Sequence, residues 1–383
     1  MSHHASPVSR APRAWLQASP WGLLVLGAFV LAGAACTGGP IERAGPLVGD
    51  AADAAAPGGR DGPASHGDAG DAGPGPDDGP TADGGGAGSD AGPADGARVD
   101  ASSCHGLTAA QCFAPISGSL NVDYDRYHPV MNCQCKGTNH QDITGVERLV
   151  FLGDSVTVGT PPTPVAEFYR TRLTEMVKAK FPGVAVSTCA DWGARTDDFL
   201  ENSNQIPRCF SGPEPRRTLI IFTMGANDIS EWAKAQLTVD DAMVQADLAA
   251  DKLVAALTYL TAPVNFPNGS YVIFGNPYEY TDATGDLLSC PAASLSGLTG
   301  NWLQGAPAVL HLQERYIEAA VDLGVDMVFT LETFCGHGYH RNDTSSQCYR
   351  GPNAEMWFDL TCLHPTPAGH AVIADLFWSV IEN

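Results

Sequence analysis

Basic residues are scarce in this sequence, and they form no cluster. Lys and Arg number 21 against 43 Asp and Glu, so the formal net charge is -22. Neutralising the phosphates of a nucleic acid requires clustered cations. The composition therefore argues against a nucleic-acid ligand, and we interpret the acidity as a means of solubility rather than as a partner site.

Large apolar side chains are nearly absent between residues 37 and 103, where Gly, Ala, Asp, Pro and Ser dominate. Such a segment cannot bury enough apolar surface to offset its loss of chain entropy on folding. We expect residues 36–103 to form a disordered acidic linker. The remaining residues, 104–383, are long enough to make one α/β domain with a sizeable core.

No apolar run in the N-terminal region is long enough to span a membrane comfortably. Arg10 and Arg13 precede the short apolar run 21–31, and small residues at 32–35 lead to Cys36. This order is typical of a secretory signal peptide, here residues 1–35. Cys36 resembles the lipidated cysteine of bacterial lipoproteins, although Gly33 stands where Leu is usual.

We therefore expect an extracytoplasmic protein, periplasmic or at the cell surface, that is anchored to a bacterial membrane through a lipid on Cys36. The linker would then serve as a tether. If Cys36 is not lipidated, the signal peptide is simply removed and the protein is secreted.

Ten cysteines remain after Cys36, an even number that suggests up to five disulfides in an exported domain. The short separations favour the pairs Cys189–Cys209 and Cys335–Cys348. A rival interpretation is a metal site at Cys133 and Cys135 with His128 or His140 nearby. That spacing is not the spacing of a zinc ribbon or finger, so we expect no metal.

Apolar strands and amphipathic helices alternate from residue 147 onward, after an irregular, disulfide-tied lead at 104–146. The expected strands are 148–152, 184–188, 217–224, 270–275 and 325–330, and the expected helices are 164–181, 239–260, 308–323 and 367–381. This alternation predicts a three-layer α/β/α sandwich of the flavodoxin-like kind, with a parallel sheet of about five strands.

Polar clusters follow two of these strands. Gly153-Asp154-Ser155 follows the first strand, and the segment 225–228, which contains Asn227, follows the third. In such folds the carboxyl ends of the strands form the ligand-binding edge. Ser155 alone could be a helix cap. The G-x-S-x-G elbow of α/β-hydrolases is absent.

Four segments in a fixed order carry a family resemblance. They are Gly153-Asp154-Ser155, Gly193 in ADWGAR, Asn227 in GAND, and His364 in HPTPAGH. In this order they resemble the SGNH (GDSL-type) hydrolases, a family named after its Ser, Gly, Asn and His. The resemblance covers most of residues 147–383.

The resemblance implies a carboxylic ester hydrolase that works through an acyl-enzyme, without a metal or an organic cofactor. Ser155 would be the nucleophile and His364 the base. The N–H groups of Ser155 and Gly193 and the amide of Asn227 would form the oxyanion hole. The expected substrate is an acylated glycan or lipid, and we expect an esterase or a carbohydrate deacetylase. The sequence shows no long apolar lid, which disfavours a long-chain lipase.

This sequence departs from the family pattern at the Asp that would complete a Ser–His–Asp catalytic triad with Ser155 and His364. The usual pattern is Asp-x-x-His, but Thr361 stands three residues before His364 and Asp359 stands five before. A wider loop, pinned by a disulfide at Cys362, could bring Asp359 to the ring, and we favour this alternative. The other is a Ser–His dyad whose ring is oriented by a backbone carbonyl. A non-catalytic surface-binding lipoprotein on the same fold, or an acyltransferase, remains an alternative function.

Overall fold

Five parallel strands form one sheet at the centre of the folded unit. A computed structural model of the chain describes residues 111–113, 124–131 and 134–383. The strands follow the order β2-β1-β3-β4-β5. Their bounds are β1 Arg148–Phe151, β2 Ala185–Thr188, β3 Thr218–Thr223, β4 Ser270–Gly275 and β5 Asp326–Val328. The predicted signal peptide, Cys36 and the linker lie outside the described residues.

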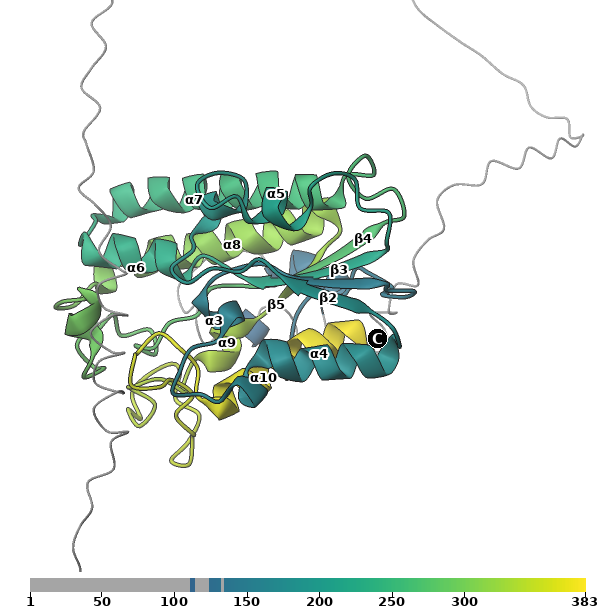
Figure 1. Ribbon diagram of the computed structural model, residues 1–383. Coiled ribbons are helices and arrows are strands. Elements are labelled where there is room, and N and C mark those ends of the chain that lie inside the picture. The colour runs from purple at the N-terminus through teal and green to yellow at the C-terminus, as the bar shows by residue number, and fades with distance from the viewer. Residues whose placement is uncertain (1–110, 114–123, 132–133) are drawn as a thin grey trace, which may run out of the picture. The chain divides into compact units, whose positions relative to one another are not determined.

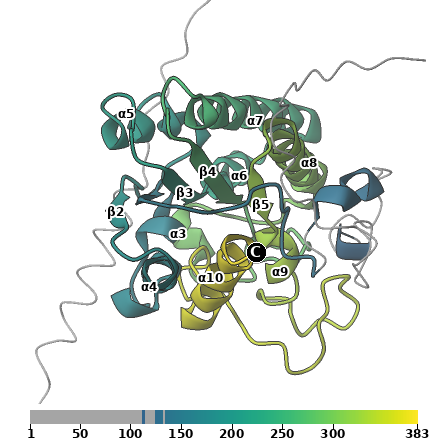
Figure 2. The same cartoon turned by 90° about the vertical axis from the view of Figure 1, so that its right-hand side faces the viewer.

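Helices cover both faces of this sheet, as the sequence predicts. α7 and α8 pack on one face, and α4 and α10 lie on the other (Figures 1 and 2). The helices are α3 Ser155–Val158, α4 Tyr169–Lys180, α5 Gln205–Cys209, α6 Ala226–Lys234, α7 Val239–Thr261, α8 Ala306–Leu323, α9 Thr330–Phe334 and α10 Pro367–Ile381. The three-layer α/β/α prediction is confirmed. None of the described helices has the length and apolar character needed to cross a membrane.

The central strands β1, β3 and β4 are mostly buried because helices cover both of their faces. Every residue of β3 is buried, and in β1 only Arg148 is partly exposed. Phe151 at the end of β1 lies in register with Ile221 of β3. The segments that follow these two strands therefore emerge side by side at the same edge of the sheet.

Three expected elements differ from the structure. The expected helix 164–181 is broken at Phe168, whose ψ of 139° is extended. Phe168 packs so closely on Gly159 that a Cβ at Gly159 would lie 2.2 Å from its ring. β2 is an edge strand with mostly exposed residues, not a buried strand. β5 ends at Val328 because Thr330, held by the side chain of Asn276, already begins α9.

Four disulfides join the described cysteines. The predicted pairs Cys189–Cys209 and Cys335–Cys348 are confirmed. The other two are Cys112–Cys135 and Cys290–Cys362. Cys135 is thus a disulfide partner rather than a metal ligand, and Cys104 and Cys133 lie outside the described residues.

The lead before β1 runs along the outer side of β5. Thr138 N–H donates to the Met327 carbonyl, and Phe329 N–H donates to the Lys136 carbonyl. The buried Asp326 of β5 accepts hydrogen bonds from the Thr138 hydroxyl and from the His140 backbone N–H. Residues 136–141, which we call the edge cover, therefore satisfy main-chain groups of a strand that would otherwise be open.

Candidate active site

Ser155 lies at the turn between the end of β1 and the start of α3. Gly153 makes this turn possible, because its φ is +115° and a Cβ there would lie 2.4 Å from the Thr223 carbonyl oxygen. Gln205 holds the turn from outside: its amide accepts from Gly153 N–H and donates to the Gly153 carbonyl. The Ser155 side chain is thereby presented at the carboxyl edge of the sheet.

Asp154 braces the same turn through hydrogen bonds to Val156 in α3 and to Thr223 at the end of β3. Its Oδ1 accepts hydrogen bonds from Val156 N–H at 3.0 Å and from the Thr223 hydroxyl at 2.8 Å. Burial raises the pKa of Asp154 to about 6, against the lowering effect of these bonds. Asp154 thus ties the end of β1 to the end of β3.

His364 faces Ser155 directly. Its Nε2 lies 2.9 Å from Ser155 Oγ, although the two residues are 209 positions apart. Burial lowers the pKa of His364 to about 4, so the ring is neutral at neutral pH and can accept a proton. Asp359 N–H donates to the His364 carbonyl, which closes the loop 359–364 on itself.

The other ring nitrogen of His364 contacts Thr361 instead of Asp359. Thr361 Oγ1 lies 2.7 Å from His364 Nδ1 and donates to Asp359 Oδ1 at 2.5 Å. Thr361 N–H donates to the same carboxylate oxygen. The Thr361 hydroxyl therefore lies between the Asp359 carboxylate and the His364 imidazole. The sequence analysis notes Thr361 only as a departure from Asp-x-x-His, so it misses this contact.

A hydrogen bond joins Asn227 to the segment that contains Gly193. Asn227 is the second residue of α6, and its Nδ2 donates to the Ala194 carbonyl at 2.9 Å. Gly193 precedes Ala194 and has a φ of +76° with open space around its Cα. A side-chain amide carries two N–H bonds, and the bond to Ala194 needs only one of them.

Asp228 fixes the segment that carries Gly193. Its two carboxylate oxygens accept from the Thr196 N–H and the Thr196 hydroxyl at 3.1 and 3.0 Å. Burial raises the pKa of Asp228 to about 7. Asp228 therefore ties the first turn of α6 to the segment that contains Gly193.

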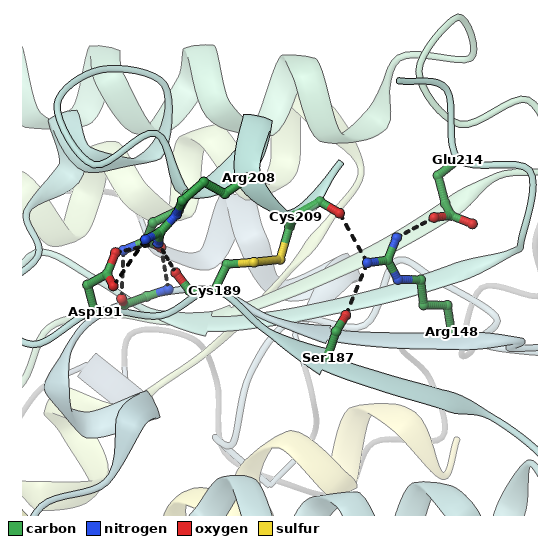
Figure 3. Close-up of a disulfide and its surroundings, with 9 residues drawn as sticks. Arg148, Ser187, Cys189, Asp191, Arg208, Cys209 and Glu214 are labelled. Atoms are coloured by element: carbon green, nitrogen blue, oxygen red, sulfur yellow. Dashed lines mark hydrogen bonds and ion pairs between the residues drawn. A yellow bond between two sulfur atoms is a disulfide. The ribbon is translucent and has the colours of Figure 1, made fainter. Parts of the chain in front are cut away.

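A disulfide and an ion pair hold the other end of this segment, as Figure 3 shows. Cys189, just after β2, is bonded to Cys209 at the end of α5. Beside it, Arg208 pairs with Asp191 at 2.5 Å. Residues 189–196 are thus fastened on both sides of Gly193, so the position of the Gly193 N–H is well defined by its surroundings.

An apolar cavity of about 450 Å³ opens at Ser155 and Asn227. Its walls come from α6, from the segment 276–305 between β4 and α8, and from the first turns of α8. The apolar lining includes Ile229, Ala233, Leu287, Leu298, Trp302 and Leu310. Tyr278 also lines this cavity.

Two other histidines at this edge have separate partners. His340 lies 3.1 Å from Asp286, and His337 stacks on Trp357 at 3.4 Å. Neither lines the cavity. Among the residues that the structure describes, no group of three or more His, Cys, Asp or Glu is arranged to hold a metal ion.

Comparisons with known proteins give one family match and several structural similarities. Residues 151–372 match the model of the GDSL-like Lipase/Acylhydrolase family. Phospholipase A1 from Streptomyces albidoflavus NA297 is 17% identical, with a TM-score of 0.41 over 61% of this chain and 99% of that chain. A member of the lipolytic protein G-D-S-L family from Veillonella parvula is 14% identical, with a TM-score of 0.40 over 62% of this chain and 98% of that chain.

The comparison with curated proteins finds no match. The assignment of the chain to a family therefore rests on the family match. Because the matched segment spans more than half of the sequence, the chain belongs to the GDSL-like lipase/acylhydrolase family.

Proposed function

We propose that this protein hydrolyses carboxylic esters, with Ser155 as the nucleophile and His364 as the base. The observation that carries the proposal is the 2.9 Å contact between Ser155 Oγ and His364 Nε2. The contact lies at the mouth of an apolar cavity that Asn227 also lines. A nucleophile, a neutral base and a donor thus converge where an ester could enter.

The reaction follows from these positions. His364 Nε2 takes the proton of Ser155 Oγ while the oxygen attacks the ester carbonyl carbon. The negative charge that develops on the carbonyl oxygen is stabilised by the N–H groups of Ser155 and Gly193 and by the free N–H bond of Asn227. His364 then gives its Nε2 proton to the leaving alcohol. Water, deprotonated by His364, releases the acid from the acyl-enzyme.

The cavity supports an acyl group larger than acetyl. Its 450 Å³ lies in the range of about 300–1,000 Å³ that is typical of pockets for drug-sized organic ligands. Ser155 and Asn227 line it but His364 does not. The leaving alcohol has to lie near His364 Nε2, so the cavity takes the other side of the ester, the acyl chain. This favours an esterase for medium-chain esters over a carbohydrate deacetylase.

The test is the hydrolysis of p-nitrophenyl acetate, hexanoate, octanoate and decanoate, with Ser155→Ala as the inactive reference. We expect kcat/KM to rise by roughly fourfold for each buried methylene until the cavity is full. Ala306→Phe, which partly fills the cavity, should abolish the preference for octanoate while acetate is still cleaved. Ala255→Phe, on the exposed side of α7, is the matched control.

Hydrolysis that does not depend on Ser155 would refute the catalytic assignment and favour a surface-binding protein. Ser155-dependent hydrolysis with acetate as the best substrate would refute only the acyl-chain assignment. Transfer of the acyl group to an added sugar in preference to water would identify an acyltransferase.

We also propose that the protein is exported and anchored through Cys36. The four disulfides among the described cysteines support an oxidising compartment outside the cytoplasm. Cys36→Ser should move the protein from the membrane fraction to the soluble fraction after cell lysis. Membrane association that is unchanged by this substitution would contradict lipid anchoring at Cys36.

A further inference from the structure

We propose that Thr361 is a positioning residue that couples Asp359 to His364, so that a Thr–Asp pair replaces the single acid of the usual triad. The inference rests on the proposed function, in which His364 is the base. It differs from both alternatives that the sequence leaves open, because neither a carboxylate nor a backbone carbonyl is the group that touches the ring. The contact to Nδ1 is a side-chain hydroxyl, at 2.7 Å.

The direction of the hydrogen bonds follows from the chemistry of the three groups. An ionised carboxylate can only accept, so the Thr361 hydroxyl must donate its hydrogen to Asp359 Oδ1. The same hydroxyl oxygen is then an acceptor for His364 Nδ1. The neutral ring therefore carries its proton on Nδ1 and leaves Nε2 free to accept from Ser155. The charge of Asp359 selects the tautomer that the reaction needs.

The backbone around Thr361 holds the hydroxyl in this place. Thr361 N–H donates to Asp359 Oδ1, and Cys362 N–H donates to the Asp359 carbonyl. Cys362 adopts a φ of +73°, which a non-glycine residue rarely adopts, and its disulfide to Cys290 fixes it from outside the loop. Tyr339 Oη donates to the Asp359 carbonyl from a neighbouring segment.

The hydrogen bonds of the Asp359 carboxylate are concentrated on Thr361. The carboxylate is buried, and no donor among the described residues reaches its Oδ2. A buried carboxylate with one oxygen unpartnered is costly, and buried polar groups usually have partners. This cost is consistent with a carboxylate that acts on the ring through one hydroxyl.

When Ser155 gives its proton to Nε2, the ring becomes an imidazolium that keeps its Nδ1 proton. The Nδ1–H donates to Thr361, and the Thr361 hydroxyl donates to Asp359, so the positive charge of the ring faces a polarised hydroxyl backed by a carboxylate. No proton passes to Asp359. The pair thus stabilises the charged base and orients it, which is the role of the triad acid.

The experiment compares Thr361→Val, Thr361→Ser, Asp359→Asn and the double variant Thr361→Val/Asp359→Asn, with p-nitrophenyl octanoate as the substrate. Valine keeps the shape of threonine and removes the hydroxyl. We expect Thr361→Val and Asp359→Asn each to lower kcat by roughly 10–100-fold, the effect of losing one hydrogen bond to a charged group, with little change in KM. Serine should restore most of kcat.

The double variant should be no slower than the slower single variant, because Asp359 acts through Thr361. Losses that multiply, or a fully active Thr361→Val enzyme, would overturn the proposal while leaving Ser155 and His364 in place. Thr258→Val is the matched control, since the exposed Thr258 also uses its hydroxyl in one hydrogen bond, to the Val254 carbonyl. We expect it to keep full activity.

A second measurement does not depend on turnover. In the ¹⁵N-labelled wild-type protein, NMR of the imidazole should show the His364 proton on Nδ1, and Thr361→Val should increase the share of the Nε2-protonated tautomer. A wild-type ring protonated on Nε2 would overturn the proposal. The tautomer of His364 can be determined even if Ser155→Ala shows that ester hydrolysis is wrongly assigned. A failure of this proposal can therefore be distinguished from a failure of the proposed function.

Discussion

At the scale of single residues, Asn227 makes two different uses of one amide group. One N–H bond holds the Ala194 carbonyl, and the other is available to a substrate oxygen. In the proposed reaction, the residue would therefore both hold the Gly193 segment and bind the developing oxyanion. Removing its side chain should affect both the position of the Gly193 segment and the stabilisation of the transition state.

We expect Asn227→Ala to lower kcat by roughly 10²–10³-fold with a much smaller change in KM, because an oxyanion donor acts mainly in the transition state. Steady-state kinetics on p-nitrophenyl octanoate would measure this. Asn268→Ala is the matched control, since Asn268 also donates one side-chain hydrogen bond to a backbone carbonyl, that of Pro215. A loss confined to KM would indicate that Asn227 binds the ground state instead.

The pH dependence of the reaction should follow the buried ring of His364. Burial lowers its pKa to about 4, and the neutral ring that serves as base is present above that value. The acid limb of kcat/KM should therefore have its midpoint near pH 4, well below the 6.5 of an ordinary histidine. A pH–rate profile measured between pH 3.5 and 8 tests this, and a midpoint near 6.5 would contradict it.

Most of the site can be predicted from the sequence because its residues follow strand ends or sit in short motifs. Ser155 lies next to His364, Asn227 lines the same cavity as Ser155, and the Asn227 side chain binds Ala194, the neighbour of Gly193. Thr361 could not be assigned in this way. A hydroxyl between a carboxylate and a ring depends on the turn of the loop 359–364, and no local pattern in the sequence specifies that turn.

At the scale of elements, the disulfide Cys290–Cys362 connects two parts of the site that are distant in sequence. Cys362 lies in the loop with His364, and Cys290 lies in the segment 276–305 that forms a wall of the cavity. The base and the acyl-chain wall are thus covalently joined. The position of each depends on the other.

Replacing both cysteines, as Cys290→Ala/Cys362→Ala, should lower kcat by roughly 10–100-fold, since small displacements of a catalytic group are costly. It should also lower the melting temperature, because a native disulfide typically contributes about 2–5 kcal/mol. Cys112→Ala/Cys135→Ala is the control, as this pair lies in the lead. We expect it to lower the melting temperature alone. Equal kcat in both double variants would contradict the link to His364.

The regular elements are predictable because buried parallel strands are continuously apolar, as in β3 and β4. The segment 276–305 is different. It has no hydrophobic periodicity, and it folds as a coil with two short 3₁₀ turns, Ala293–Ser296 and Leu303–Gly305. Its role in the cavity depends on tertiary contacts such as the Trp302 Nε1–H bond to the Leu237 carbonyl. For this reason the cavity wall cannot be predicted from the sequence.

At the scale of the whole molecule, several buried carboxyl groups hold their protons more tightly in the folded state than in the unfolded chain. Burial raises the pKa of Asp154 to about 6, and that of Asp228 and Glu332 to about 7. A carboxyl group with a raised pKa stabilises the fold below its unfolded pKa, and this stability is lost as the pH rises through the folded pKa. Hydrogen bonds from Arg216 lower the pKa of Glu214 to about 2, so Glu214 loses its contribution only in stronger acid.

The melting temperature should therefore be highest near pH 4.5 and fall between about pH 4.5 and about pH 7, the folded pKa of Asp228 and Glu332. The net charge of -22 acts in the same direction, because self-repulsion grows as carboxyl groups ionise. Thermal unfolding followed across this pH range would measure the slope. Glu332→Gln should flatten it, since glutamine does not titrate. A melting temperature that rises from about pH 4.5 to about pH 7 would contradict the prediction.

The edge cover has a consequence for where the functional unit begins. Residues 136–141 precede the family match, which starts at residue 151, yet they hydrogen-bond along β5, the outermost strand of the sheet. A chain shortened to residues 147–383 would keep every residue of the site. It would also expose a row of unpaired main-chain donors and acceptors, on which a second molecule could add a strand. The smallest version of this protein that keeps this edge covered should therefore be longer than the smallest version that contains the candidate site.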